Sequence, residues 1–142
     1  MKTVKQIFKN KETAVYATTS GSSVLEALKI MMEKNISALL IIEDDQLLGI
    51  FTERDYARKI ILKGKSSKET LIKDVMTVNP FTISPDEKVS NCMELMTNNH
   101  YRHLPVVENG RVLGMVSIGD LVKFIIEDQK QTIRQLESYI NS

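Results

Sequence analysis

The heptapeptide GMVSIGD at residues 114–120 has a near copy, GIFTERD, at residues 49–55. Each copy contains a glycine, two apolar residues, a hydroxyl residue and, three positions later, an aspartate. A shift of 65 residues aligns residues 16–61 with residues 81–126 without a gap. An ungapped match of this length indicates two copies of one structural unit.

The second copy predicts a β-α-β-β-α order of elements. Ser84-Pro85-Asp86-Glu87 is typical of a helix start, with Ser84 as the N-cap, and the helix is expected to end near Asn98-Asn99. Two short apolar runs around Asn109-Gly110 predict a hairpin, and Ser117 opens another helix. Cys92 falls on the apolar stripe of the first of these helices.

The first copy predicts the same order, with Asp44-Asp45 as the hairpin turn and a helix from Thr52. Its apparent lead-in, TVKQIF at residues 3–8, has the same apolar pattern as a segment before the second copy. The expected fold class is α/β (α+β), with two β-α-β-β-α repeats. The predicted division is 1–62 for repeat 1 with its lead-in, 63–73 for a linker, 74–127 for repeat 2 and 128–142 for a C-terminal helical extension.

Composition narrows the class of protein. The 142 residues are 42% hydrophobic with a net charge of +1, so neither a nucleic-acid partner nor an acidic tail is expected. No apolar run reaches the roughly 18 residues of a membrane span, and the first residues lack the apolar core of a secretion signal. The single cysteine excludes an internal disulfide, and we expect a cytoplasmic protein.

The repeated motif has two interpretations. A hydroxyl residue followed three positions later by an acid is a capping-box pattern, which needs no ligand. The same geometry suits a ribonucleotide, because the helix start attracts a phosphate and the aspartate can accept from both ribose hydroxyls. The motif alone leaves both interpretations open.

The whole chain, from about Val4 to Ile126, resembles a tandem pair of cystathionine-β-synthase-type (CBS) domains, known as a Bateman module. The residues that carry the resemblance are ISALLIIEDDQLLGIFTERD (36–55), DVMTVNPFTISPDEKV (74–89) and YRHLPVVENGRVLGMVSIGDLV (101–122). The resemblance implies a pseudo-twofold module that binds adenine nucleotides in two clefts between the repeats.

The resemblance also implies which residues line each cleft. For the first cleft they are Ala17, Thr18, Ser37, Ala38, Thr52 and Asp55. This cleft is either weaker or completed by Arg54, Arg58 or a residue that reaches across. For the second cleft they are Thr77, Pro80, Ile83, Arg102, His103, Pro105, Ser117 and Asp120. The hydroxyl and aspartate of each repeated motif are expected to contact ribose, and Arg102 and His103 are expected to contact phosphate.

The two clefts are not expected to be equal. Arg102-His103 aligns with Ser37-Ala38, which cannot neutralise a phosphate, so the second cleft is the better candidate for a charged nucleotide. We rank AMP first, then NAD, ADP and ATP, and expect no catalytic cofactor. No metal is expected, because the spacing of His100, His103 and Cys92 fits no standard ligand set.

The tail after Ile126 has no counterpart in the first copy. Val122, Ile126, Gln129, Ile133, Leu136 and Ile140 follow one another in alternating steps of four and three residues, which is a heptad seam. The last helix is therefore expected to continue to near Asn141. Its seam packs either on the module itself or on the same helix of a second chain, and we favour a homodimer.

The sequence shows no paired nucleophile and base, no metal set and no P-loop lysine motif, so an enzyme is not expected. Repeats and tail use the whole sequence, which predicts a stand-alone nucleotide-binding regulator of an unidentified protein partner. The alternative is a homodimeric interaction scaffold with vestigial clefts. An enzyme that acts on nucleotides is a third hypothesis, and a product formed from ATP or NAD would reveal it.

Overall fold

The structure, a computed structural model, describes residues 2–9 and 14–141. Met1, residues 10–13 and Ser142, which belong to the predicted first repeat and tail, lie outside the described residues. The elements in chain order are α1 (Val4–Lys9), β1 (Ala17–Thr18), α2 (Val24–Lys34), β2 (Ala38–Glu43), β3 (Gln46–Thr52), α3 (Glu53–Tyr56), the π-helical turn η1 (Ala57–Ile61), the 3-10 turn η2 (Ile72–Asp74), β4 (Thr77–Val78), α4 (Val89–Asn99), β5 (His103–Glu108), β6 (Arg111–Ser117) and α5 (Ile118–Ile140). This mixed arrangement of helices and sheets confirms the expected fold class.

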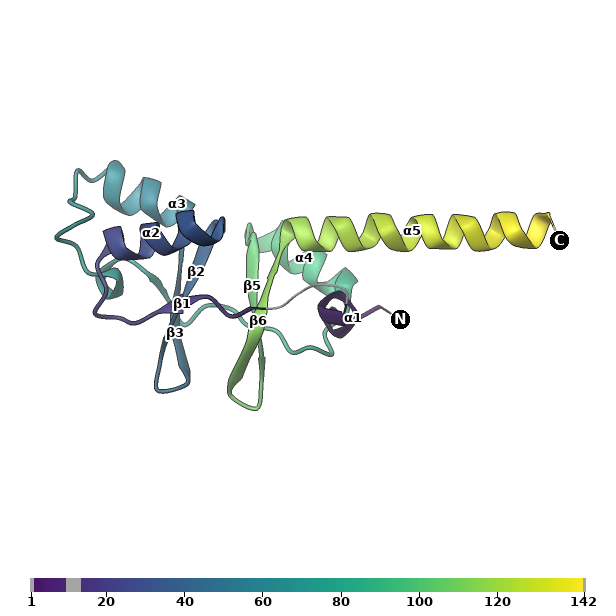
Figure 1. Ribbon diagram of the computed structural model, residues 1–142, viewed down its shortest axis with the longest axis horizontal. Coiled ribbons are helices and arrows are strands. Elements are labelled where there is room, and N and C mark those ends of the chain that lie inside the picture. The colour runs from purple at the N-terminus through teal and green to yellow at the C-terminus, as the bar shows by residue number, and fades with distance from the viewer. Residues whose placement is uncertain (1, 10–13, 142) are drawn as a thin grey trace.

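Two hairpins, β2–β3 and β5–β6, stand side by side in the middle of the molecule with their turns pointing the same way (Figure 1). Both predicted turns are confirmed. Asp44 and Asp45 have φ of 49° and 61°, and Asn109 and Gly110 have φ of 53° and 76°. Two consecutive positive φ angles are typical of the type I′ turn, whose twist matches that of the strands it joins.

The first hairpin is the centre of a four-stranded sheet in the order β1-β2-β3-β4, whereas β5 and β6 form a two-stranded sheet. β1 runs parallel to β2, and β4 runs antiparallel to β3. In the second repeat, the counterpart of β1 is a single parallel bridge between Ile83 and Val106.

The two hairpins share an apolar interface. Ala38, Leu40 and Ile50 of the first hairpin are buried and pack with Val112 and Met115 of the second. Burial of this surface stabilises the pairing of the repeats because apolar contact removes water from both faces. The interface fixes the position of the two hairpins relative to each other.

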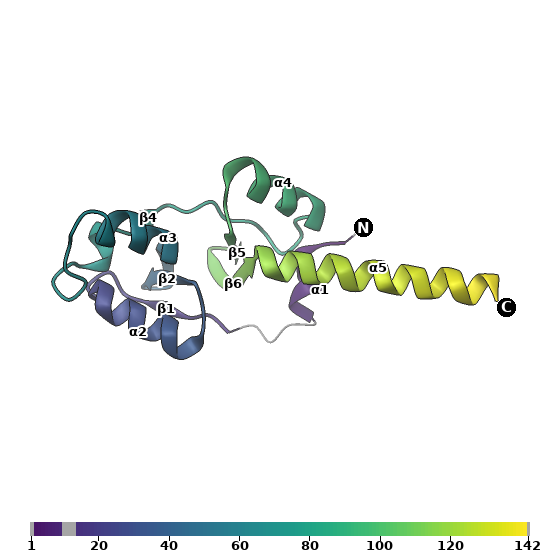
Figure 2. The same cartoon turned by 90° about the horizontal axis from the view of Figure 1, so that it is seen from above.

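The lead-in helix α1 packs on the second repeat, not on the first. Val4 and Ile7 are buried with Val89, Cys92 and Leu104 of the second repeat. Figures 1 and 2 show α1 beside α5, on the side of the molecule away from α2 and α3. TVKQIF therefore precedes the first repeat in the chain but packs on the second, which the sequence pattern did not predict.

The segment before the second repeat makes the reciprocal contact. Ile72 and Val75 are buried with Val24, Leu39 and Phe51 in the core of the first repeat. Each lead-in thus covers the core of the other repeat. Because of this exchange, neither core is complete without residues from both halves of the chain.

Helix α4 begins at Val89, four residues after the predicted start at Pro85. Ser84 caps only a local turn, in which its Oγ accepts from the backbone N–H of Asp86 at 3.1 Å. The carbonyl oxygens of Pro85 and Glu87 accept from the N–H groups of Lys5 and Val4, at 2.9 and 3.0 Å. This exchange of lead-ins holds the segment extended. The predicted end of the helix at Asn99 is confirmed.

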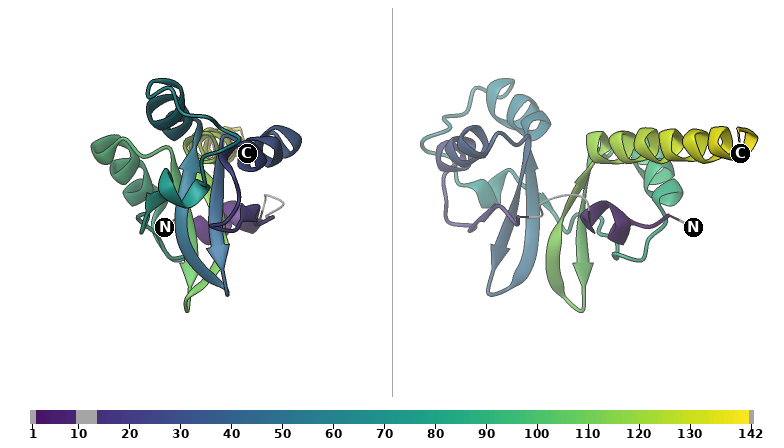
Figure 3. Two further views of the ribbon diagram at one scale, coloured as in Figure 1. Left: turned by 90° about the vertical axis from the view of Figure 1, so that its left-hand side faces the viewer. Right: turned by 45° about the vertical axis from the view of Figure 1, so that its right-hand side comes forward.

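Helix α5 extends beyond every other element (Figures 1 and 3). Its first turns pack on the body through Leu121, Phe124 and Ile125. Further along the helix, Asp128 Oδ1 forms an ion pair with Lys2 Nζ at 3.2 Å. All side chains from 129 to 141 are exposed, so in this structure the tail does not pack on its own module.

Candidate functional site

The repeated motif forms the same structure in both copies, at the junction of the hairpin and the next helix. Thr52 Oγ1 accepts from the N–H of Asp55 at 3.1 Å, and Asp55 Oδ2 accepts from the N–H of Thr52 at 3.0 Å. Ser117 Oγ accepts from the N–H of Asp120 at 3.1 Å, and Asp120 Oδ2 accepts from the N–H of Ser117 at 2.8 Å. Both copies are therefore full capping boxes.

The start of the neighbouring strand lies against each capping box. The carbonyl of Ser37 accepts from the N–H of Glu53 at 3.1 Å, and Ala38 is the register partner of Thr52. In the second repeat, the carbonyl of Arg102 accepts from the N–H of Ile118 at 2.9 Å.

His103 is the register partner of Ser117. In the structure, Ser37 and Ala38 thus lie beside the first capping box, and Arg102 and His103 lie beside the second. Their contact with a nucleotide stays a prediction.

A direct contact links the two groups across the repeats. Ser37 Oγ lies 3.0 Å from His103 Nε2. The two capping boxes therefore flank one boundary between the repeats, at the ends of the hairpins opposite the turns.

Thr77 differs from its predicted placement. Its Oγ1 donates to Asp55 Oδ1 at 3.3 Å, so Thr77 lies beside the first capping box and not with Ser117 and Asp120. The cause is the exchange of lead-ins, which pairs β4 with β3 of the first repeat.

The side chain of Asp55 is largely enclosed by its neighbours. Its side chain is 13% exposed, and Oδ1 also forms an ion pair with Lys59 Nζ at 3.3 Å. Lys59 Nζ donates in turn to the carbonyl of Val75 at 2.8 Å. A ligand at Asp55 would have to replace contacts that Thr77 and Lys59 already make.

The other predicted residues are spread over both repeats. Ala17 and Thr18 pair with Leu40 and Ile41 in the parallel part of the sheet. Ile83 and Pro105 are joined by a backbone hydrogen bond of 3.0 Å. Arg54 is exposed on α3, and Pro80 is half-buried between β4 and Ile83. The predicted residues therefore do not converge on one enclosed cavity.

A hollow of about 380 Å³ lies between the two hairpins, nearer to their turns. Two of the predicted residues, Ala17 and Thr18, line it, together with Asp45 and Arg111. Arg111 was missed because its position, directly after the Asn109-Gly110 turn, indicated only a hairpin. Placing the two hairpins side by side by their repeat symmetry would have shown that Arg111 and β1 border the same hollow.

Two aromatic residues were also missed. The rings of Phe81 and Tyr101 stack with centroids 6.1 Å apart and an interplanar angle of 28°. They are 48% and 38% exposed and adjoin Pro80 and Arg102 in sequence. Partly exposed aromatic rings beside a basic residue offer a surface on which a planar base can stack.

Cys92 has no chemical role at this site. Its side chain is fully buried in the second core, and burial raises the pKa of the thiol to about 11. Among residues 2–9 and 14–141, no three His, Cys, Asp or Glu side chains are grouped as a metal ion would need. No helix in the same residues is long and apolar enough to cross a membrane.

The fold and the paired motifs define a tandem CBS-domain module, and comparison with known proteins places the chain in that family. The family model for the CBS domain matches residues 4–62 and 72–127, so the chain belongs to the CBS-domain family.

The CBS domain-containing protein CBSX3, mitochondrial, of Arabidopsis thaliana is 42% identical over 127 residues. The match covers 86% of this chain and 62% of the relative, so the chain spans less than two thirds of that protein.

Solved structures agree with this assignment. A CBS-domain protein from Burkholderia ambifaria is 45% identical, with a TM-score of 0.86 over 89% of this chain and 96% of its own. A CBS domain pair in complex with 5′-methylthioadenosine and S-adenosyl-L-methionine is 29% identical, with a TM-score of 0.79 over 90% and 98%. The protein CBSX2, in complex with AMP, is 21% identical and shares the fold, with a TM-score of 0.75 over 91% and 99%.

Proposed function

We propose that the chain is a regulatory, non-catalytic protein that binds an adenine nucleotide between its two CBS repeats. The observation that carries this proposal is the pair of capping boxes beside the boundary where Ser37 meets His103. Each box presents an aspartate next to a helix start, which can accept from ribose hydroxyls. The complexes of related CBS pairs with AMP and with S-adenosylmethionine support an adenosine-type ligand.

The second capping box is the stronger candidate for a charged nucleotide. Helix α5 has 23 residues, so the aligned peptide dipoles favour an anion at its start, whereas α3 has only 4 residues before it changes to a π-helical turn. Arg102 is exposed and its backbone is bonded to the start of α5. We therefore propose AMP as the first ligand to test, followed by NAD, ADP and ATP.

The proposed phosphate contact separates AMP from ligands without a phosphate. A hydrogen bond to a charged group contributes about 1.5–3 kcal/mol. Arg102→Ala should therefore weaken AMP binding roughly 10- to 100-fold and leave adenosine binding nearly unchanged, as measured by calorimetric titration.

Arg111→Ala is the matched variant, since Arg111 lines the hollow between the hairpins. A loss of AMP affinity in Arg111→Ala alone would move the phosphate to the hollow. Equal losses for AMP and adenosine in Arg102→Ala would contradict a phosphate contact.

We also propose that the chain forms a homodimer, because the seam of α5 is exposed. Ile133 and Leu136 are 53% and 58% exposed, and they lie on the part of the helix that extends beyond the other elements (Figure 1). In this proposal, nucleotide binding changes the fraction of dimer, because the ligand binds the monomer and the dimer with different affinity.

The cytoplasmic location stays a prediction, and the Arabidopsis relative is described as mitochondrial.

A further inference from the structure

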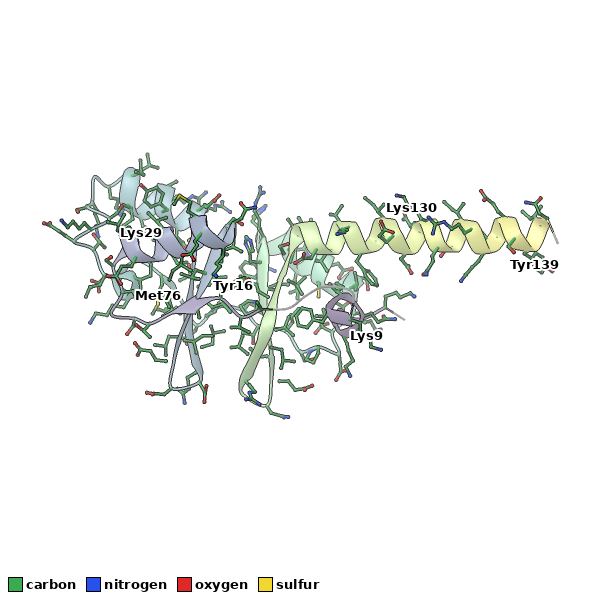
Figure 4. The ribbon with its side chains drawn as sticks, viewed as in Figure 1. Lys9, Tyr16, Lys29, Met76, Lys130 and Tyr139 are labelled. Atoms are coloured by element: carbon green, nitrogen blue, oxygen red, sulfur yellow. The ribbon has the colours of Figure 1, made fainter. Side chains whose placement is uncertain are left out.

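Helix α5 carries an exposed apolar seam along its whole length. Val122 and Ile126 are 44% and 45% exposed although they lie next to the body, and Ile140 is 76% exposed near the end of the helix. The seam from Val122 to Ile140 is about 27 Å long at the rise of an α-helix. Figure 4 draws Lys130 and Tyr139 on the part of the helix that extends beyond the other elements.

An open surface borders the first half of this seam. An open hollow of about 510 Å³ is lined by Ile118, Val122, Lys123, Ile126 and Glu127, all from α5 itself. Its lining combines the apolar side chains of Ile118, Val122 and Ile126 with the charged Lys123 and Glu127, which suits contact with another amphipathic helix.

We propose that the tails of two copies of this chain pair antiparallel, so that the second half of each seam covers the first half of the other. This inference rests on the homodimer proposed above and is independent of nucleotide binding. In this register Val122 faces Ile140 of the second copy, and Ile126 faces its Leu136. Gln129 faces Ile133, and the same three layers recur by symmetry.

Every position of the seam thus finds a partner in the antiparallel register. Five of the six positions are apolar: Val122, Ile126, Ile133, Leu136 and Ile140. Only three of these apolar positions lie beyond the body, which is too few for a stable isolated pair of tails. When the whole seam takes part, two copies supply ten apolar side chains. Gln129 is the polar exception, and it lies next to the symmetry axis.

The charges beside the seam favour the antiparallel direction. In antiparallel pairs, the residue that follows Val122, Lys123, lies opposite the residue that follows Leu136, Glu137. The symmetry makes this ion pair twice. In a parallel pair, Glu137 would instead face Thr132 and Lys130 would face Ile125, so no opposite charges would meet.

The direction also separates the two bodies. With Val122 opposite Ile140, the two bodies lie at opposite ends of the paired helices. In a parallel pair, both bodies would lie at the same end of the seam. In the antiparallel register, Lys130 lies near Lys130 of the second copy. This like-charge contact and the polar Gln129 weaken the pairing and keep it reversible.

The first test measures the association of the full chain by sedimentation velocity over a range of concentrations. Ile133→Asp/Leu136→Asp should weaken the dimer roughly 100-fold, because charges enter the apolar layers. Both residues are exposed, so the thermal midpoint of the body should stay unchanged. Gln131→Asp/Ser138→Asp adds the same two charges on the opposite face of the helix and should leave the dimer intact.

The second test fixes the direction. Lys123→Glu and Glu137→Lys should each weaken the dimer roughly tenfold, and the double variant should restore it. A failure of the double variant to restore association would overturn the antiparallel register.

A dimer insensitive to the seam variants would overturn the tail pairing and leave the homodimer. A monomeric wild-type chain would overturn both. None of these outcomes depends on a nucleotide.

Discussion

Asp55 shows how one carboxylate can belong both to the fold and to a candidate site. Its oxygens accept from the Thr52 N–H and from Thr77 Oγ1, and one of them pairs with Lys59. The capping interpretation of the repeated motif is confirmed by these contacts, and the ribose interpretation stays a proposal. The capping box uses Oδ2, so a ribose at Asp55 would have to replace Thr77 and Lys59 at Oδ1.

Glu43 gives a prediction at the same scale. The side-chain hydroxyl of Ser20, and then its backbone N–H, donate to Glu43 Oε1 and hold the pKa of this carboxyl below its usual value of 4.5. A lowered pKa in the folded state adds stability above the unfolded pKa, and this stability is lost as the pH falls through the folded pKa.

Ser20→Ala should therefore be less stable than the wild type at about pH 7, and the difference should narrow towards about pH 3. Urea denaturation at several pH values measures this difference. Ser90→Ala, on the exposed side of α4, is the control. A difference that is constant over the whole pH range would contradict the assigned cause.

Element boundaries were predicted well where the determinants are local. The two turns, the end of α4 and the extent of α5 follow from turn chemistry and apolar spacing within a few residues. The start of α4 does not follow from local sequence, because the carbonyls of Pro85 and Glu87 accept hydrogen bonds from residues 5 and 4, which are distant in the chain. The first copy held a usable signal, since Ser23 and Glu26 form the N-cap of α2 at the position that aligns with Lys88.

The approach of β4 to β3 depends on Gly49. A Cβ at this position would lie 2.7 Å from Met76 Sδ and 2.8 Å from the carbonyl oxygen of Thr77. Gly49→Ala should destabilise the protein by about 1–3 kcal/mol, because the backbone of β4 has to move.

Gly21→Ala is the matched control, since nothing lies within 4 Å of its added Cβ. Urea denaturation measures both variants. Equal stability of the two would show that β4 is free to shift.

At the scale of the whole molecule, the sequence predicted two repeats but not the exchange between them. The repeat shift relates each residue to its counterpart and says nothing about which copy it packs on. Ile7 and Val75 illustrate the point, because their apolar pattern is the same whether they cover their own repeat or the other. The same exchange explains why Thr77 lies beside Asp55.

Ile7→Ala tests the exchange. The side chain is 4% exposed in the core of the second repeat, so its truncation should cost about 2–5 kcal/mol. Amide hydrogen exchange should increase first in α4, β5 and β6. An increase confined to β2 and β3 would contradict the packing of α1 on the second repeat.

The central claim is that the second capping box binds the ribose of an adenine nucleotide, and calorimetric titration tests it most directly. AMP, NAD, ATP and S-adenosylmethionine would be titrated into the wild type and into Asp120→Ala, with urea denaturation to correct for the lost cap. We expect saturable binding of AMP that weakens roughly 10- to 100-fold in Asp120→Ala. Unchanged affinity in the variant, or no binding of any of the four ligands to the wild type, would contradict the claim. Either result would favour the alternative of a homodimeric interaction scaffold with vestigial clefts.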